Sequence, residues 1–247
     1  MKKQFNSFLF LFVTIAAVSL ACQSLTGGST PPPITEGVLP VTEFPVTESS
    51  VTEESNLTPG LPYDSSTYAC GVFEGIPVAA QYTSAPDILI DTAGRYTATI
   101  RMAKGGEIFI ELYADKAPIT VNSFVFLACK GFYDNTTFHR VLSDFMAQGG
   151  DPTGTGMGGS GYEFVNEYND LSFSKPGVLA MANAGPATNG GQFFITFNPA
   201  EWLDGGYTIF GKVLKGMDVV LGITLRDPES TPAFEGDVIE SIVIEGK

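Results

Sequence analysis

The chain has 247 residues, 44% hydrophobic and 16% charged, which is enough for one sizeable core. Its formal net charge is −14, and this acidic surplus without a basic block argues against nucleic acid and against electrostatic docking on anionic lipid as partners. With a single His and no Cys/His group at zinc spacing, we expect no metal and no cofactor.

Residues 1 to 21 have the pattern of a signal peptide. Two lysines precede an apolar run, Phe8 to Leu20, that is too short to cross a bilayer comfortably. The run ends in Ser19-Leu20-Ala21-Cys22, which resembles a bacterial lipobox, although Ser19 stands where Leu is more usual. This predicts an extracytoplasmic protein, anchored to the cell membrane or envelope by a lipid on Cys22. The alternative is an ordinary secretory signal cut near Ala21.

The next segment, residues 22 to 66, is the expected lipidated N-terminus and a tether rich in Thr, Ser, Pro and Glu. Such a composition cannot bury a core, so we predict disorder. Residues 67 to 94 contain short apolar groups broken by Gly and Pro, and we expect them to pack on the outside of the domain that follows, residues 95 to 247.

Two more cysteines, Cys70 and Cys129, have no assigned role. A disulfide between them is compatible with a location outside the cytoplasm. The other interpretation is two separate thiols, with Cys129 buried on a helix. The sequence does not settle the pairing, and we favour separate thiols.

Residues 95 to 247 predict a mainly β fold. Tyr96 to Met102 and Glu107 to Tyr113 alternate like the strands of a hairpin, and a helix opens at Pro118 and ends at Gly131. Further strands are expected at 178–182, 192–196, 208–213 and 238–244, with a short helix at 217–223. We predict one closed antiparallel barrel with two capping helices, whose last strand pairs with its first.

The stretch from Phe138 to Asp151 carries a lone cation in an apolar run. We interpret it as two short strands joined by a turn at Ser143-Asp144. A buried cation without a partner is costly, so we expect Arg140 at the rim of a pocket, pointing into it. Alternation turns His139 away from that face, and we interpret His139 as structural.

These residues resemble the cyclophilins, a family of peptidyl-prolyl cis-trans isomerases. The likeness runs from about Tyr96 to Ile244 and does not cover residues 1 to 93. The motifs that carry it are 111–118 with 122–124, 138–151, 179–186 with 189–195, 201–205 and 210–213. The resemblance implies an eight-stranded barrel with two capping helices.

The resemblance also implies a site. Its catalytic positions match Arg140, Phe145, Gln148 and Asn183, with Gln148 helping to hold the arginine. Its substrate-binding positions match Met146, Ala182, Ala184, Gln192, Phe194, Trp202, Leu203, Tyr207 and Gly156, the last beside a secondary pocket. Trp202 implies cyclosporin binding, whereas Tyr207 stands where the best-studied members have histidine.

The chemistry of X-Pro rotation explains this residue set. The bond has a barrier of roughly 18–20 kcal/mol because its C–N bond is partly double. Twisting localises a lone pair on the proline nitrogen, and a hydrogen-bond donor aimed there lowers the barrier. The reaction needs no nucleophile, base or metal.

We therefore expect a monomeric isomerase that acts on proline-containing polypeptides of the secreted or envelope class. The alternative is a non-catalytic module or chaperone that binds proline segments. A structural stalk protein, resting on residues 23 to 66 alone, is the weakest interpretation.

Overall fold

The computed structural model describes residues 69 to 246. The predicted signal peptide (1–21), the lipidation site Cys22 and the tether to residue 66 lie outside this range. Within it, no helix combines the length and the hydropathy needed to cross a bilayer.

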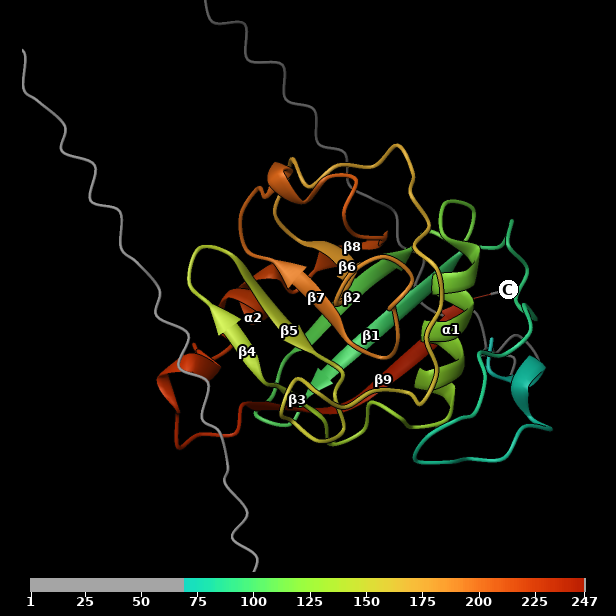
Figure 1. Ribbon diagram of the computed structural model, residues 1–247, viewed down its shortest axis with the longest axis horizontal. Coiled ribbons are helices and arrows are strands. Elements are labelled where there is room, and N and C mark those ends of the chain that lie inside the picture. The colour runs from blue at the N-terminus through green and yellow to red at the C-terminus, as the bar shows by residue number, and fades with distance from the viewer. Residues whose placement is uncertain (1–68, 247) are drawn as a thin grey trace, which may run out of the picture. The chain divides into compact units, whose positions relative to one another are not determined.

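Nine strands, counted over residues 69 to 246, form one antiparallel sheet that curls into a nearly closed barrel (Figure 1). The predicted mainly β fold with two α-helices is confirmed. The strands are β1 (Tyr96–Met102), β2 (Glu107–Leu112), β3 (Thr137–Phe138), β4 (Arg140–Leu142), β5 (Met146–Gly149), β6 (Val178–Met181), β7 (Phe193–Thr196), β8 (Ile209–Lys215) and β9 (Asp237–Gly246). The helices are α1 (Pro118–Cys129) and α2 (Met217–Leu221), with short 3-10 helices η2 (Gly71–Phe73), η3 (Glu201–Leu203) and η4 (Pro228–Ser230).

The strand count exceeds the predicted eight because the chain bends at His139. Thr137 pairs with Val238 of β9, whereas Arg140 pairs with Gln148 of β5. β9 pairs with β1 as predicted, but that pairing does not close the barrel. The sheet order is β3-β9-β1-β2-β8-β6-β7-β5-β4, so its two outer strands, β3 and β4, are consecutive in the chain. A bridge between Thr137 of β3 and Asp151, just after β5, holds β3 beside the β5 end of the sheet.

Apolar side chains pack against both the inner and the outer face of the barrel sheet. Inside, Phe124 of α1 packs edge-on to Phe193 at 5.6 Å between ring centroids and lies 5.2 Å from Phe210. Each such fully buried side chain contributes roughly 1.5–3 kcal/mol. A second, smaller apolar cluster contains Met146 and Phe194. Alternation along β5 and β7 places this cluster on the outer face, where it forms a floor for the site.

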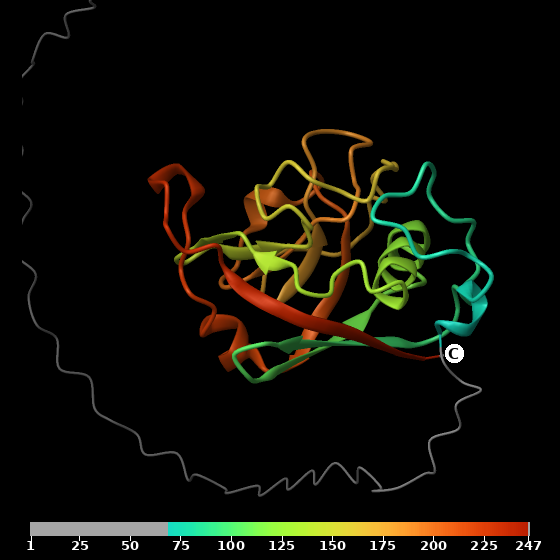
Figure 2. The same ribbon diagram turned by 90° about the horizontal axis from the view of Figure 1, so that it is seen from below.

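Helix α1 is buried over nine consecutive residues, Thr120 to Ala128. A helix buried on all sides needs cover beyond the sheet. Residues 69 to 94 supply it, and Figure 2 shows them beside α1. The rings of Phe73 and Tyr82 lie 5.3 and 4.8 Å from that of Phe126, and Asn122 accepts a hydrogen bond from Leu89 N–H at 3.0 Å.

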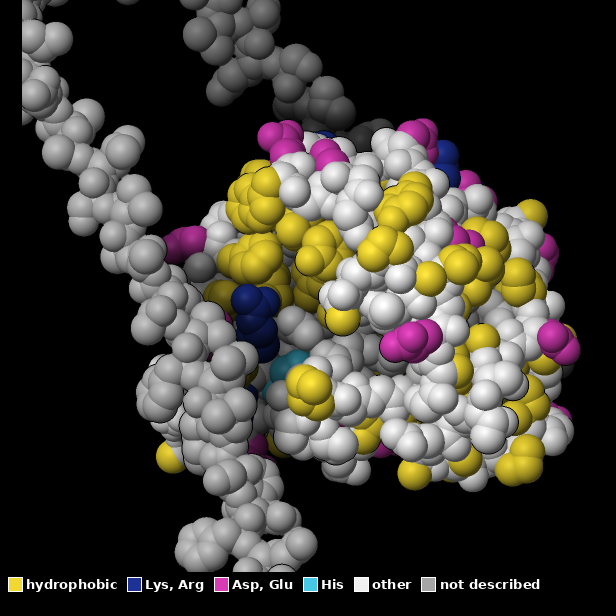
Figure 3. All heavy atoms as spheres, viewed as in Figure 1, with side chains coloured by type: hydrophobic (Ala, Val, Ile, Leu, Met, Phe, Trp, Pro, Cys, Tyr) yellow, Lys and Arg dark blue, Asp and Glu magenta, His cyan; other side chains and the backbone are white. Residues whose placement is uncertain are grey.

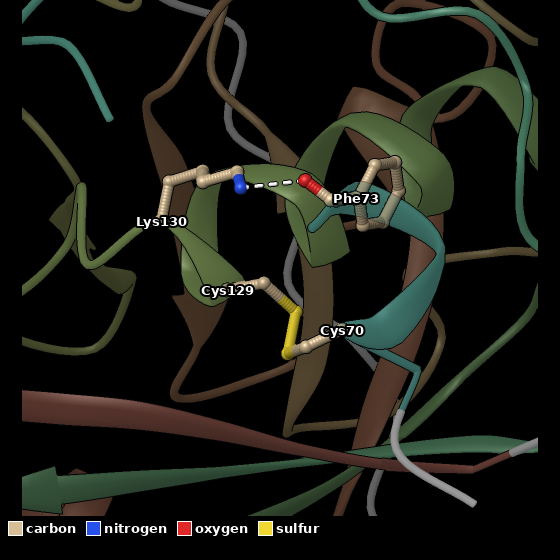
Figure 4. The surroundings of a disulfide bond; sticks show 4 residues. All are labelled: Cys70, Phe73, Cys129 and Lys130. Atoms are coloured by element: carbon tan, nitrogen blue, oxygen red, sulfur yellow. Dashed lines mark hydrogen bonds between the residues drawn. A yellow bond between two sulfur atoms is a disulfide. The ribbon is translucent and has the colours of Figure 1, made fainter. Parts of the chain in front are cut away.

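A disulfide joins Cys70 to Cys129 across 59 residues of sequence (Figure 4). The favoured prediction of two separate thiols was therefore wrong. The bond ties the residue just before η2 to the last residue of α1, and beside it Lys130 Nζ donates to the Phe73 carbonyl at 2.6 Å. Local pattern could not reveal the pairing because the two cysteines meet only after residues 69 to 94 fold over the helix.

Candidate active site

Arg140 heads a row of side chains on the outer face of the barrel. It pairs directly with Gln148 on β5, and Gln148 pairs directly with Phe194 on β7. Directly paired residues of antiparallel strands project from the same face. Met146 lies two residues before Gln148 and so joins the same face. The register therefore gathers four of the predicted site residues.

A pocket of about 180 Å³ opens over this row. It brings together nine predicted site residues: Arg140, Phe145, Met146, Gln148, Ala182, Asn183, Phe194, Leu203 and Tyr207. Apolar side chains form most of the wall, and the Tyr207 ring stands edge-on to Phe194 at 5.5 Å between centroids. Figure 3 shows hydrophobic side chains grouped beside a basic one on this side of the molecule.

The donors of Arg140 are available at the lip of the pocket. Its guanidinium carbon lies 6.0 Å from the centre of the Phe145 ring. The ion pairs found among residues 69 to 246 involve other cations, namely Arg101, Lys104, Lys116 and Lys212. Arg140 is therefore the partnerless cation that the sequence predicted at a pocket rim, and it is half-buried there.

The strand that carries Arg140 is held from both sides. β5 pairs with one edge of β4. On the other edge, Val141 and Arg226 exchange backbone hydrogen bonds of 2.7 and 2.9 Å. The Arg226 guanidinium also donates to the carbonyl oxygen of His139. These contacts fix the backbone on both sides of Arg140.

Gln148 and Gln192 are bonded to each other. Gln148 Nε2 donates to Gln192 Oε1 at 2.9 Å, and Gln192 Nε2 donates to the carbonyls of Gly156 and Gly158 at 3.0 and 2.8 Å. Among the described residues, Gln148 makes no hydrogen bond to Arg140, and its side-chain amide donates to Gln192 instead. Gln148 thus links the Arg140 row to the glycine-rich loop, residues 154–161.

The prediction omitted Asp151, which organises that loop. This buried carboxylate accepts hydrogen bonds from the backbone N–H groups of Thr153, Thr155, Gly156 and Gly158, at 2.7, 3.1, 2.7 and 3.1 Å. Burial alone would raise the pKa of Asp151, but these donors outweigh it and the net pKa is lowered. The available signal was an Asp directly before a run of Thr and Gly.

A second, larger pocket of about 740 Å³ adjoins the first. Gly156, Ala184 and Gln192, all predicted site residues, line it, and Gln148, Ala182 and Asn183 line both pockets. The backbone N–H and C=O of Asn183 have no partner within residues 69 to 246, whereas Ala182 N–H donates to the Gln192 carbonyl at 3.0 Å. Asn183 therefore presents unpaired backbone groups between the two pockets.

Trp202 lies outside both pockets. It is on η3, and 70% of its surface is exposed. Its ring lies 5.8 Å from that of Phe145, so it extends the apolar wall beyond the pocket rim.

His139 faces away from the pocket, beneath the glycine-rich loop. Its side chain is 1% exposed, and neither ring nitrogen has a hydrogen-bond partner among the described residues. Burial lowers the pKa of His139, although nearby Asp151 opposes this. A neutral, enclosed imidazole has no path to a molecule bound over Arg140.

Comparison with known proteins decides the family. A family model matches residues 97–244, and its description is "Cyclophilin type peptidyl-prolyl cis-trans isomerase/CLD". The chain belongs to this isomerase family. The match begins in β1 and ends in β9, so residues 69 to 94 lie outside the cyclophilin domain.

Curated relatives carry the same activity in their names. A Neurospora crassa protein named peptidyl-prolyl cis-trans isomerase-like 1 is 51% identical over 145 residues, which cover 56% of this chain and 89% of the relative. The human protein of that name is 48% identical over 142 residues, covering 55% of this chain and 86% of the relative.

Solved structures agree. A Cryptosporidium parvum cyclophilin type isomerase superposes with a TM-score of 0.54 at 34% identity and covers 61% of this chain and 98% of that one. The structure of that protein in the presence of the dipeptide Ala-Pro gives a TM-score of 0.55 at 35% identity, with 60% and 98% covered. The cyclophilin fold and enzyme class inferred from the motifs are thus confirmed.

Proposed function

We propose that this cyclophilin accelerates cis-trans rotation of X-Pro bonds in secreted or envelope proteins and so assists their folding. Uncatalysed exchange takes tens to hundreds of seconds, slow enough to limit folding. An enzyme that reaches newly exported chains removes that delay. The substrate class is a proline-containing segment that is still accessible.

One observation carries the proposed mechanism: Arg140, without a carboxylate partner among residues 69 to 246, stands at the lip of an apolar pocket. Phe145, Met146, Phe194 and Leu203 bind the proline ring by burying it. Arg140 donates to the proline nitrogen as its lone pair localises, which stabilises the twisted bond more than the planar one. An arginine suits this role because it is always charged and its donors are fixed in one plane.

The unpaired backbone of Asn183 supplies the second requirement. Rotation needs one side of the bond held while the other turns. The N–H and C=O of Asn183 hold the substrate backbone next to the pocket that binds the proline. Ala182 and Ala184 flank it with side chains small enough to admit an extended peptide.

A coupled protease assay on a proline peptide tests the hypothesis that the protein is an active isomerase. Wild type and Arg95→Ala, a matched loss of an exposed arginine just before β1, are expected to be equally active. Arg140→Ala is expected to fall by roughly a hundredfold or more, as when an oxyanion donor is removed. If wild type and Arg140→Ala both show only the uncatalysed rate, the hypothesis of isomerase activity is rejected.

The proposed location is outside the cytoplasm, on a lipid anchor at Cys22. Two observations support it: the signal-like N-terminal sequence and the Cys70–Cys129 disulfide, a bond typical of oxidising compartments. Mass spectrometry of the mature N-terminus tests the anchor. A diacylated Cys22, lost in Cys22→Ser along with membrane fractionation, is the expected result. An unmodified N-terminus near residue 22 would instead indicate ordinary secretion.

A further inference from the structure

The larger pocket has a wall that the cyclophilin domain does not provide. Gln81, from the segment before β1, lines this pocket together with Gly156 and Ser160 of the glycine-rich loop and with Glu163, which follows the loop. Gln81 lies outside the region that matches the family model, 97–244. The pocket of this chain is therefore partly built by its own N-terminal extension.

The extension is fixed against the loop at this point. Tyr82 N–H donates to the Ser160 carbonyl at 2.7 Å, and the Tyr82 ring packs on Phe126 of α1. Gly161 has a φ of +92°, and a Cβ there would lie 2.5 Å from the Tyr82 carbonyl oxygen and 2.9 Å from the Gln81 Cβ. Only glycine allows the two backbones to approach this closely. Gln81 is thus held at the pocket edge by its neighbour.

The geometry also says which part of a substrate reaches this pocket. The reacting nitrogen must face Arg140, and the chain that precedes the proline continues from that nitrogen. Gln148, directly opposite Arg140, lines both pockets, whereas Phe145 and Leu203 line only the smaller one. The residues before the proline therefore run toward the larger pocket. Side chains two apart in an extended chain share a face, so the residue two before the proline points into it.

Polar and apolar surface line this pocket in similar measure. Of the residues that line it, Glu163 alone is charged, and the side chains of Gln81, Gln192 and Thr188 supply neutral polar groups. We propose that Gln81 is a specificity-determining residue, and that the pocket prefers a long basic side chain two residues before the proline. This inference rests on the proposed isomerase function, because it assumes that the proline occupies the pocket beside Arg140.

The test uses the full chain and three peptides, Ala-Xaa-Ala-Pro-Phe with Lys, Glu or Ala as Xaa. The catalytic efficiency kcat/KM is measured for each by NMR exchange. Wild type is expected to prefer Lys to Glu. Gln81→Lys is expected to lower the Lys-to-Glu ratio by roughly two- to fivefold and Gln81→Glu to raise it, since exposed charge pairs are worth that much. The Ala peptide should be unaffected.

Val72→Lys is the matched control: it places the same charge on an exposed residue of the extension that does not line the pocket, and it should leave the ratio unchanged. Active enzymes with the same ratio in wild type, Gln81→Lys and Gln81→Glu would overturn the role of Gln81 and leave the isomerase function intact. If neither wild type nor any variant accelerates exchange, the isomerase proposal fails. The role of Gln81 is then tested by binding: the Lys-to-Glu ratio of the peptides' affinities, measured by titration calorimetry, should shift in the same way between wild type and the two Gln81 variants.

Discussion

Arg140 and Gln148 are directly paired across β4 and β5, yet the side-chain amide of Gln148 donates to Gln192 at 2.9 Å. Gln148, which lies opposite the proposed catalytic cation, is hydrogen-bonded to Gln192. Gln192 in turn donates to the carbonyls of Gly156 and Gly158. Two glutamines therefore connect the proline pocket to the loop that shapes the larger one.

The first prediction concerns this connection. Gln148→Met keeps the volume and removes the amide, leaving Gln192 Oε1 without its donor. We expect kcat/KM to fall roughly three- to tenfold, the usual net value of one hydrogen bond. In a double-mutant cycle, the double variant should lose little more than Gln192→Met alone, which already breaks the bond to Gln148 as well as those to Gly156 and Gly158. Fully additive losses would show that the two glutamines act independently.

His139 predicts a pH dependence. Its folded pKa is lowered, first by burial, with Arg226 and Arg140 acting in the same direction and Asp151 opposing them. Between this folded pKa and the unfolded value near 6.5, the unfolded chain binds more protons, so stability rises with pH in that window. Stability is correspondingly lost as pH falls below about 6.5, down to the folded pKa.

The chain contains one histidine, so the measurement is direct. A single imidazole resonance should titrate below 6.5 in the folded protein, and His139→Leu should show less loss of unfolding free energy between pH 7 and pH 5 than wild type. An imidazole pKa above 6.5 would contradict the burial argument.

The disulfide should contribute measurably to stability. A cross-link over 59 residues restricts the unfolded chain, which the loop-entropy model values at about 4 kcal/mol. We expect reduction to lower the free energy of unfolding by roughly 2–4 kcal/mol, measured by denaturant titration with and without reductant. The Cys70→Ala/Cys129→Ala variant serves as the control and should be insensitive to reductant. A wild type equally stable in both conditions would mean that the extension opens independently of the barrel.

Helix α1 depends on a distant carboxylate. Its N-cap residue, Ala117, offers no side-chain cap, and Glu167 accepts instead from the N–H groups of Ile119 and Thr120 at 2.9 and 2.7 Å. Glu167→Ala should destabilise the fold by about 1–2 kcal/mol, as other helix N-caps do. Glu163→Ala, exposed and without a hydrogen bond among the described side chains, should change it by less than about 0.5 kcal/mol. Equal effects of the two would remove the capping interpretation.

The sequence predicted what depends on local periodicity. Alternation located β1, β2 and β9, and Pro118 and Gly131 delimited α1. It could not predict features made by contacts between distant segments. One such feature is the bridge between Thr137 and Asp151, where β3 approaches β5, which the sequence does not signal.

The site residues likewise fall into those that the sequence could predict and those that depend on contacts between distant segments. The cost of burying an unpaired cation pointed to Arg140, and the family motifs supplied the pocket residues. The motif could not reveal that Gln148 bonds Gln192, because that depends on the register between β5 and β7. Gln81 was missed because it reaches the larger pocket from a segment outside the family domain.

We infer that Arg140 acts on the twisted bond and not on the bound peptide as such. The most direct test measures, for wild type and Arg140→Ala with one proline peptide, both the exchange rate at saturation and the dissociation constant by NMR. We expect Arg140→Ala to lose roughly a hundredfold or more of the catalysed rate while its dissociation constant changes by only a few fold. A variant that isomerises as fast as wild type would contradict it, as would one whose rate falls only because the peptide no longer binds.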